Sequence, residues 1–365
     1  MADSIKSIYS PEYIERLGRT LSAFSTAVSV TDFQNAVYGN DWEQLEFKQR
    51  AARIAESMQR VLPGDYPAAL AVLDEAAPSF GGLEGIVFPE FVARFGLDHQ
   101  ERSLQALETY TRYSSSEFAV RPFLKQDLSG TLKRMTAWTK SPDEHVRRLA
   151  SEGSRPRLPW GEGVPALKKN PDLTLPILEE LAQDPSIYVQ KSVANHLNDI
   201  SKTHPDLFIE TVTRWKEKGG RTGWIVKHAS RSLLKKGDSR ILALFGFYPG
   251  STNVSKLTFA PSRLPIGDSA EFSFVVSAEL ETKVRVEFAV DYVKSSGRRT
   301  RKVFHVTETD MAPMTSRRFT KQLSFRQLTT RIHFPGQHTL AILINGEEKS
   351  AVDFELIDTP KEPLP

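Results

Sequence analysis

The chain has 365 residues, of which 39% are hydrophobic and 25% charged, a composition typical of a globular protein with two or three domains. It has no cysteine, which excludes disulfides, thiolate metal sites and cysteine nucleophiles and favours a reducing, cytoplasmic location. No apolar run reaches the length of a membrane-spanning helix, and the first residues lack the apolar centre of a secretory signal, so we expect no membrane partner.

The net charge is only +3, but basic residues are concentrated in two regions. They outnumber acidic residues in 134–240, and in 292–331 there are ten Lys or Arg residues against two acids. A local basic excess on a nearly neutral chain is typical of a protein that binds a polyanion. We therefore expect nucleic acid as the partner, with two solvated basic faces as the alternative.

Residues 1–244 are predicted to be helical. Apolar residues recur at helical spacing in 42–55, and several later segments begin with Asp or Ser beside proline, which is a helix-start signal. The expected helices in this later part are 173–181, 187–200, 207–215 and 224–234. Their starts are roughly 15 to 20 residues apart, so a helix pair takes about 35 residues, the period of HEAT-like repeats. We therefore predict an α-helical HEAT-like repeat solenoid, with a simple orthogonal helix bundle as the alternative.

The pattern changes after the helical region. Residues 245–253 are rich in turn-forming residues and are interpreted as a linker, and 254–358 alternate apolar and polar side chains with the period of a β-strand. The pair Asn345-Gly346 is a hairpin signal. About seven short strands fit into this region, which predicts an all-β immunoglobulin-like sandwich. The proline-rich end, 359–365, is expected to be a frayed tail.

One segment, 146–161, differs from an ordinary repeat. A helix that carries Arg148 is expected to end at Gly153, and two arginines, two prolines and a tryptophan follow. Prolines stiffen the loop, which would hold three side chains in place: Arg155, Arg157 and Trp160. Arginine suits phosphate oxygens, and an indole ring offers a stacking surface. The alternative is a connection between helices whose tryptophan fills a gap in the core.

Three serines precede Glu117 and Phe118. We expect the serines to cap a helix and Glu117 to lie in its first turn. The helix dipole favours an acid at that position whether or not the acid has a function. The segment is therefore a candidate site only in combination with others.

Two later helices carry polar side chains at helical spacing. In 188–200, Lys191 and Asn195 share the side opposite the apolar stripe, which suits a groove that binds a DNA backbone. Asn198 and Asp199 are expected to be hydrogen-bond partners between helices. The next expected helix would present one basic ridge of residues four apart: Lys227, Arg231 and Lys235.

Other classes of site have no support in the sequence. It contains no phosphate-binding lysine loop, no GxGxxG after a strand and no HExxH, and its eight histidines lack metal-ligand spacing. We therefore expect no metal and no cofactor. A Ser/His/Asp site has no local signature here.

Four segments together resemble the AlkC branch of the AlkD-like, HEAT-repeat DNA glycosylases. They are SSEFAVRPF (115–123), HVRRLASEGSRPRLPWG (145–161), YVQKSVANHLNDISKTHPDLF (188–208) and KHASRSLLKKGD (227–238). The resemblance covers most of residues 1–245. The β domain resembles the immunoglobulin-like module found in one subgroup of that branch.

This resemblance implies a monofunctional DNA glycosylase of base excision repair. Its substrates would be cationic N-alkylated bases in duplex DNA, in particular 3-methylcytosine and 3-methyladenine, removed without being flipped into a pocket. The implied catalytic residues are Glu117, Glu152 and Trp160. The DNA contacts that we expect are Phe118, Arg148, Arg155, Arg157, Lys191, Asn195, Lys227, Arg231, Arg298 and Arg299. The protein is expected to act as a monomer.

Two other functions remain open from the sequence. Helical-repeat proteins usually bind rather than catalyse, so a non-catalytic scaffold for nucleic acid or protein is the main rival. A damage sensor that binds lesions without cutting them is the other. Acids placed among phosphate-binding arginines, as between Glu152 and Trp160, favour the enzyme.

Overall fold

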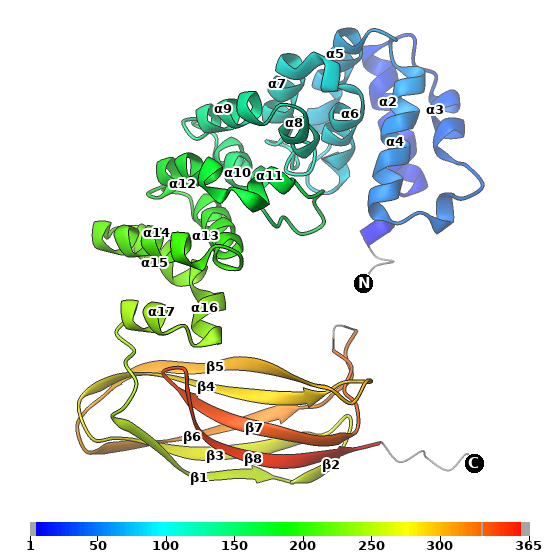
Figure 1. Cartoon of the computed structure of the whole chain (residues 1–365). Coiled ribbons are helices and arrows are strands. Elements are labelled where there is room, and N and C mark those ends of the chain that lie inside the picture. Colours follow the sequence, from blue (N-terminus) through cyan, green and yellow to red (C-terminus); the bar gives the residue numbers. More distant parts are fainter. Residues whose placement is uncertain (1–4, 330, 359–365) are drawn as a thin grey trace, which may run out of the picture. The chain divides into compact units, whose positions relative to one another are not determined.

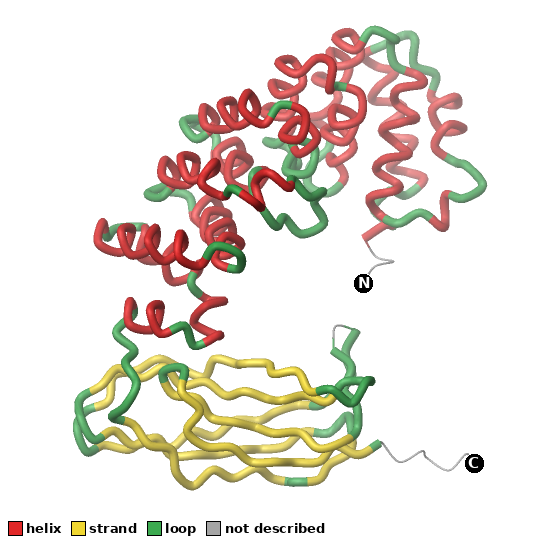
Figure 2. Tube along the Cα trace, in the orientation of Figure 1, coloured by secondary structure: helices red, strands yellow, loops and turns green. Residues whose placement is uncertain are grey.

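The computed structural model describes residues 5–329 and 331–358. The chain divides into two compact units, Met1–Ala229 and Ser230–Pro365. The first is helical, and the strands of the described residues all lie in the second (Figure 2). A helical domain followed by an all-β domain confirms the predicted fold class. The predicted tail, 359–365, lies outside the described residues.

The helices of the first unit follow one another with short connections (Figure 1). The α-helices are α2 (Pro11–Phe24), α3 (Val30–Val37), α4 (Phe47–Val61), α5 (Tyr66–Ala76), α6 (Val87–Phe95), α7 (Gln100–Tyr110), α8 (Arg121–Gln126), α9 (Leu128–Trp138), α10 (Glu144–Gly153), α11 (Pro165–Lys169), α12 (Leu175–Leu181), α13 (Ile187–Ser201), α14 (Pro205–Lys218) and α15 (Thr222–Ala229). Short 3-10 turns are η1 (Trp42–Gln44), η2 (Ala77–Ser79), η3 (Glu84–Ile86), η4 (Leu97–His99) and η5 (Pro171–Thr174).

Local sequence explains where the helices near the candidate site begin. The Ser186 hydroxyl accepts a hydrogen bond from the backbone N–H of Tyr188 at 3.2 Å and caps α13. Pro205 occupies the first turn of α14, where its missing N–H costs no hydrogen bond. A side-chain oxygen that accepts from a free N–H stabilises a helix start by about 1 kcal/mol. The predicted starts of these two helices are thereby confirmed within two residues.

Helix α13 is covered by neighbours on several sides, because it packs against α10, α14 and α15. Its predicted apolar stripe, which includes Val189 and Val193, is fully buried. Asp199 is also buried, so part of its polar side faces protein rather than solvent. The helices of this unit stack in chain order, as a repeat solenoid predicts (Figure 1). In the ranges described, no helix combines the length and apolar character needed to cross a bilayer.

The prediction of a single helix at 224–234 is wrong. Helix α15 ends at Ala229, and a separate helix, α16 (Arg231–Lys236), begins after Ser230. Ser230 has a ψ of −7°, which departs from the α-helical value and interrupts the helix. Lys227 and Arg231 therefore lie on different helices and in different compact units. The prediction of one basic ridge along a single uninterrupted helix is therefore wrong.

The compact units also divide earlier than the predicted boundary at residue 244. Helices α16 and α17 (Ser239–Leu244) cluster with the strands. The segment predicted as a linker is held there as well, because the Asn345 amide donates to Tyr248 O at 2.8 Å and Lys283 Nζ to Phe245 O at 3.2 Å. Phe247 is buried. Packing of this segment against strands explains the earlier division.

The second unit is a sandwich of two sheets. One has the order β1-β3-β6 and the other β2-β8-β7-β4-β5. The strands are β1 (Thr252–Ala260), β2 (Arg263–Pro265), β3 (Ser269–Ala278), β4 (Thr282–Val293), β5 (Arg299–Met311), β6 (Thr315–Ser324), β7 (Gly336–Ile344) and β8 (Glu347–Ile357). Alternating side chains of β3, among them Phe272, Phe274 and Val276, enter the shared apolar core. This arrangement is the predicted immunoglobulin-like architecture.

Two details of the sandwich test the strand predictions. Asn345 and Gly346 both have positive φ, 50° and 82°, and join β7 to β8, which confirms the hairpin turn. The described strands number eight, whereas about seven were expected. The short strand β2 pairs in parallel with β8. Three residues ending in proline give no alternation by which a strand could be recognised.

Candidate active site

The segment singled out by the sequence begins at the end of α10. This helix ends at Gly153, as predicted. A side chain is excluded there, because a Cβ on Gly153 would lie 2.6 Å from Val120 Cγ1. The close approach brings the end of α10 against the turn that precedes α8. Glu152 and Glu117 come from these two segments.

Glu152 is only 6% exposed and is held by three polar partners. Arg155 Nη1 donates to Glu152 Oε1 at 2.6 Å, and the Ser192 hydroxyl of α13 donates to Glu152 Oε2 at 2.6 Å. Arg148, one turn earlier on α10, lies 3.7 Å from Oε1. Both carboxylate oxygens are therefore fixed in direction. A charge held in this way in a poorly solvated place acts more strongly on its neighbours than a charge in water.

Arg148 joins Glu152 to Glu117. Its guanidinium forms an ion pair with Glu117 and donates to the Ser115 hydroxyl at 3.1 Å. That hydroxyl in turn donates to Glu117 Oε2 at 2.9 Å. The guanidinium also lies 5.2 Å from the centre of the Tyr188 ring. The structure thus brings the two predicted catalytic acids to one guanidinium, although they are far apart in sequence.

We expected Glu117 in the first turn of a helix, but the structure does not place it there. Residues 117–120 form a turn, with Val120 N donating to Ser116 O at 3.1 Å, and α8 begins only at Arg121. The Ser116 hydroxyl donates to Leu107 O at 2.8 Å, and the Ser115 hydroxyl accepts from the backbone N–H of Glu117 at 3.5 Å. Arg148, rather than a helix dipole, is therefore the group that compensates the charge of Glu117.

We predicted that Arg155 contacts a phosphate, but the structure directs its guanidinium to two carboxylates instead. Its side chain is buried, with 7% of the residue exposed, and Nε donates to Asp199 Oδ2 at 2.8 Å while Nη1 binds Glu152. Burial opposes its charge, but the hydrogen bonds that it donates to the two carboxylates raise the pKa of Arg155 above its ordinary value. Asp199 also receives Lys202 Nζ from the end of the same helix at 3.2 Å, and its bond with Arg155 confirms it as a partner between segments. Arg148 is directed to carboxylates too.

Arg121 is a structural residue that the sequence analysis did not single out. Its buried Nη1 donates to Gly153 O at 2.9 Å and to Arg155 O at 3.0 Å, and its Nε donates to Glu162 O. Burial lowers the pKa of Arg121 to about 10. One side chain thus fastens both ends of the loop after α10. The sequence offers no sign that this arginine is turned inward.

Trp160 lies exposed at the tip of the same loop. It is 66% exposed, and its φ of 61° is in the left-handed region, which is a strained conformation for a bulky residue. The Lys48 ammonium of α4 donates to Trp160 O at 2.9 Å and lies 4.8 Å from the centre of the Phe118 ring. A hollow of about 370 Å³ beside Trp160 is lined by Phe47 and Lys48 among others. The ring is therefore presented at the surface and does not fill the core.

Comparisons with known proteins extend this geometry. A family model described as "DNA alkylation repair enzyme" matches residues 105–233, and one described as the C-terminal Ig-like domain of the uncharacterised protein YhaZ matches 253–358. The chain is 48% identical over 357 residues to the uncharacterized protein YhaZ of Bacillus subtilis (strain 168), covering 98% of this chain and 100% of that one. The chain belongs to the DNA alkylation repair enzyme family. Its second unit carries the C-terminal Ig-like domain.

A solved structure assigns the chain to the AlkC type within this family. It is the alkylpurine DNA glycosylase AlkC of Pseudomonas fluorescens, bound to DNA that contains an abasic site analog. The identity is 37%, the TM-score is 0.93, and the match covers 97% of this chain and 99% of that chain. The segment with both acids, Arg148 and Trp160 lies inside the part matched by the family model.

The remaining predicted DNA contacts of this AlkC-type chain are spread over both units. Phe118 contacts Lys48, Arg157 is exposed in the loop, and Lys191 is exposed next to Ser192 on α13. Asn195 and Lys227 are half-buried on α13 and α15. Three lie in the second unit: Arg231, Arg298 and Arg299. Within the described ranges, no group of three or more His, Asp or Glu side chains is arranged to hold a metal.

Lys48 is the second residue that sequence reasoning missed, and it gives a first prediction. Replacing Lys48 with Met removes the donor to Trp160 O, so the strained tip should relax and single-turnover base excision should fall by about tenfold. Lys48→Arg, which keeps a charged donor, should restore most of the rate. The measurement is the excision rate at saturating enzyme beside the affinity for the same DNA. A loss confined to affinity would show that Lys48 acts on phosphate and not on the loop.

His196 gives a second prediction, on stability. It is completely buried behind Glu152, with Nδ1 3.0 Å from Ser151 O, and burial lowers its pKa to about 3. Below about pH 6.5, His196 is protonated in the unfolded chain but stays neutral in the folded chain. The free energy of unfolding therefore decreases as the pH falls toward 3. The slope approaches about 1.4 kcal/mol per pH unit. Equilibrium unfolding at pH 7 and pH 5 should show a smaller pH dependence in His196→Gln; equal dependence would contradict this.

Proposed function

We propose that this protein is a monofunctional DNA glycosylase that excises cationic N-alkylated bases, 3-methylcytosine and 3-methyladenine, from duplex DNA in base excision repair. The observation that carries the proposal is the pairing of two carboxylates, the buried Glu152 and the half-buried Glu117, with one guanidinium on the helix that precedes the exposed Trp160. The likeness to AlkC, an alkylpurine DNA glycosylase, supports it. We propose further that the base is removed without being flipped into a pocket.

The chemistry of a cationic base explains why so few groups are needed. Cleavage of its N-glycosidic bond neutralises the base, so the leaving group needs no proton from an acid. Positive charge develops instead on the deoxyribose, which becomes oxocarbenium-like. Fixed negative charge and an aromatic face both stabilise such a cation. A water molecule then supplies the oxygen that completes hydrolysis, and a carboxylate can orient it. Neither step requires a metal or a cofactor.

In this proposal, Glu117 and Glu152 supply the negative charge and Trp160 the aromatic face. Arg148 and Arg155 are positioning residues, since they hold the carboxylates and prevent them from rotating away. The interactions are set before substrate binds, and preorganised charge is the form in which electrostatic stabilisation costs least at the moment of reaction.

DNA binding is assigned to side chains outside this network. Arg157 and Lys191 are exposed and basic, and Phe118, Asn195 and Lys227 lie on the same unit. We propose that Arg231, Arg298 and Arg299 of the second unit add further contacts to the duplex. Each phosphate contact should steepen the dependence of binding on salt. The protein is proposed to act as a monomer.

Base release from methylated duplex DNA tests the proposal. Purified protein should release free 3-methyladenine and 3-methylcytosine, identified by mass, and leave abasic sites. A known alkylpurine glycosylase run beside it is the control for the assay. If that control releases base and this protein releases none, the proposal is wrong. A ring-neutral lesion should be released far more slowly, because its base is a poorer leaving group.

A damage sensor is the alternative that the exposed Trp160 keeps open, since a stacking ring can recognise a lesion without cutting it. The two functions differ in turnover. With substrate in excess, a glycosylase releases several equivalents of base per protein molecule, whereas a sensor releases none.

A further inference from the structure

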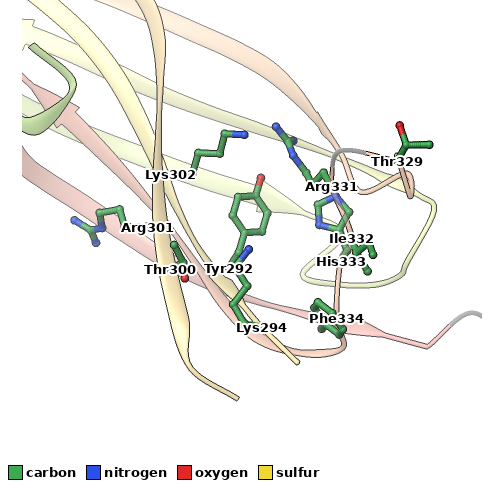
Figure 3. Close-up of a pocket in the computed structure, with 10 residues that line it drawn as sticks. All are labelled: Tyr292, Lys294, Thr300, Arg301, Lys302, Thr329, Arg331, Ile332, His333 and Phe334. Carbon is green, nitrogen blue, oxygen red and sulfur yellow. The ribbon is translucent and has the colours of Figure 1, made fainter. Parts of the chain in front are cut away.

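A recessed hollow of about 460 Å³ lies in the second unit, apart from the residues assigned to excision (Figure 3). Its lining comes from the end of β4, from the start of β5 and from residues 331–334. Three cations stand around it: Lys294, Lys302 and Arg331. The described lining residues include no carboxylate.

The three cations lack acidic partners in the part of the chain that the structure describes, since no ion pair joins any of them to a carboxylate. A fourth, Arg301, behaves differently because its guanidinium pairs with Asp291 and Glu348. Figure 3 shows the Arg301 side chain directed away from the others. The hollow therefore combines three positive charges with no neutralising group of its own.

Crowding of like charges has a visible electrostatic consequence. Burial, together with the nearby charges of Arg331, Lys235 and Lys294, lowers the pKa of Lys302. Such an arrangement opposes folding, because the Lys302 ammonium is charged less easily beside its neighbours. An anion placed among these cations would favour the charged form of Lys302 and offset this cost to folding. Perturbed groups gathered in a concave place are typical of binding sites.

Neutral polar groups complete the lining. Tyr292 and His333 are 7% and 3% exposed, and the Tyr292 hydroxyl and His333 Nε2 have no hydrogen-bond partner among the described residues. Figure 3 shows the Tyr292 hydroxyl directed between the ends of Lys302 and Arg331. A buried hydroxyl left unpaired costs about 1–3 kcal/mol, so a ligand that accepts its proton is favoured.

Aromatic rings, and not acids, hold Arg331. Its guanidinium carbon lies 6.0 Å from the centre of the Tyr292 ring and 5.6 Å from that of Phe304. Stacking fixes the plane of the guanidinium and leaves its edge N–H groups available. Planar, fork-shaped donors of this kind match the oxygens of a phosphate.

We propose that this hollow is an anion site that receives one phosphate group. Lys294, Lys302 and Arg331 supply the charge, and the Tyr292 hydroxyl supplies a neutral donor. The phosphate belongs either to a phosphomonoester, as in free phosphate or a terminal nucleotide, or to a phosphodiester of the DNA backbone. Phosphate binding at this site does not require base excision, so the failure of one proposal leaves the other intact.

Calorimetric titration of the full-length protein with inorganic phosphate tests the site, with ionic strength held constant by chloride. The wild type should bind one phosphate per chain. The double variant Lys302→Met/Arg331→Met should bind it at least about tenfold more weakly, because charge-assisted hydrogen bonds are lost. Lys321→Met, on the exposed face of β6, is the matched control and should bind as the wild type does. Equal binding by the double variant would overturn the proposal, as would no binding by the wild type.

Thermal unfolding gives a readout that does not rely on the variant's affinity alone. Without phosphate, Lys302→Met should raise the unfolding temperature of the second unit, because a like charge is removed. Phosphate should raise it in the wild type and not in the double variant. A phosphate-induced rise that is the same in both proteins would contradict the site.

Two small probes distinguish the sources of the phosphate. Thymidine 5′-monophosphate carries a phosphomonoester, and the dinucleotide dTpdT carries only a phosphodiester. Binding of the first alone, lost in the double variant, assigns the site to a terminal or free phosphate. Binding of both, lost in the double variant, assigns it to the DNA backbone. Binding of inorganic phosphate without either probe assigns the site to free phosphate, and failure of inorganic phosphate to bind rejects the site.

Discussion

Glu152→Gln should lower base excision by on the order of 100-fold while leaving affinity for DNA nearly unchanged. The substitution keeps the size of the side chain and its ability to hydrogen-bond to Ser192 and Arg155, but it removes the negative charge beside the sugar. Removal of one preorganised group in comparable sites costs about 3 kcal/mol of transition-state stabilisation. Single-turnover excision of 3-methyladenine, beside a binding titration with the same duplex, measures both quantities.

Glu144→Gln is the matched control, because Glu144 lies on the same helix, is exposed and accepts a hydrogen bond from the Ser186 hydroxyl. It should excise at the wild-type rate. Glu117→Gln should resemble Glu152→Gln if the two acids act on one cation, and the double variant should then lose less than the product of the single losses. Excision by Glu152→Gln at the wild-type rate would remove Glu152 from the mechanism.

Signals that act over a few residues were predictable from the sequence. The cap at Ser186, the helix end at Gly153 and the hairpin at Asn345-Gly346 each depend on neighbouring residues, and each is present. The change from helical to strand periodicity likewise predicted the order of the two domains. The break at Ser230 was missed because its neighbours continue the helical pattern and nothing local marks the turn.

Pairing between distant residues was not predictable in the same way. An arginine in a basic loop suits phosphate, and only the fold shows that Arg155 meets Asp199, 44 positions away, instead. Lys48 reaches the carbonyl of Trp160 over 112 positions. The acids themselves were named through the family resemblance, and their sharing of Arg148 needed the structure. The sequence shows the sign of each charge, but the partner of each charge depends on how the chain packs.

Arg155→Met should destabilise the helical unit by about 3–5 kcal/mol, the largest stability effect that we expect. The guanidinium is buried between Glu152 and Asp199, so its loss leaves two carboxylates in a poorly solvated place with too little positive charge. Lys202 compensates Asp199 only in part, at 3.2 Å from Oδ1. Denaturant unfolding followed by circular dichroism of the helices measures the change.

Arg157→Met, two positions along the same loop, separates burial from charge, because Arg157 is exposed. It should change the free energy of unfolding by less than about 0.5 kcal/mol. Arg155→Lys should fall between the two variants, since an ammonium replaces the charge but cannot bind both acids with a planar fork. If Arg155→Met proves as stable as Arg157→Met, the ion pairs are solvated. The carboxylate of Glu152 is then not held rigidly, and the preorganisation on which the excision chemistry rests is absent.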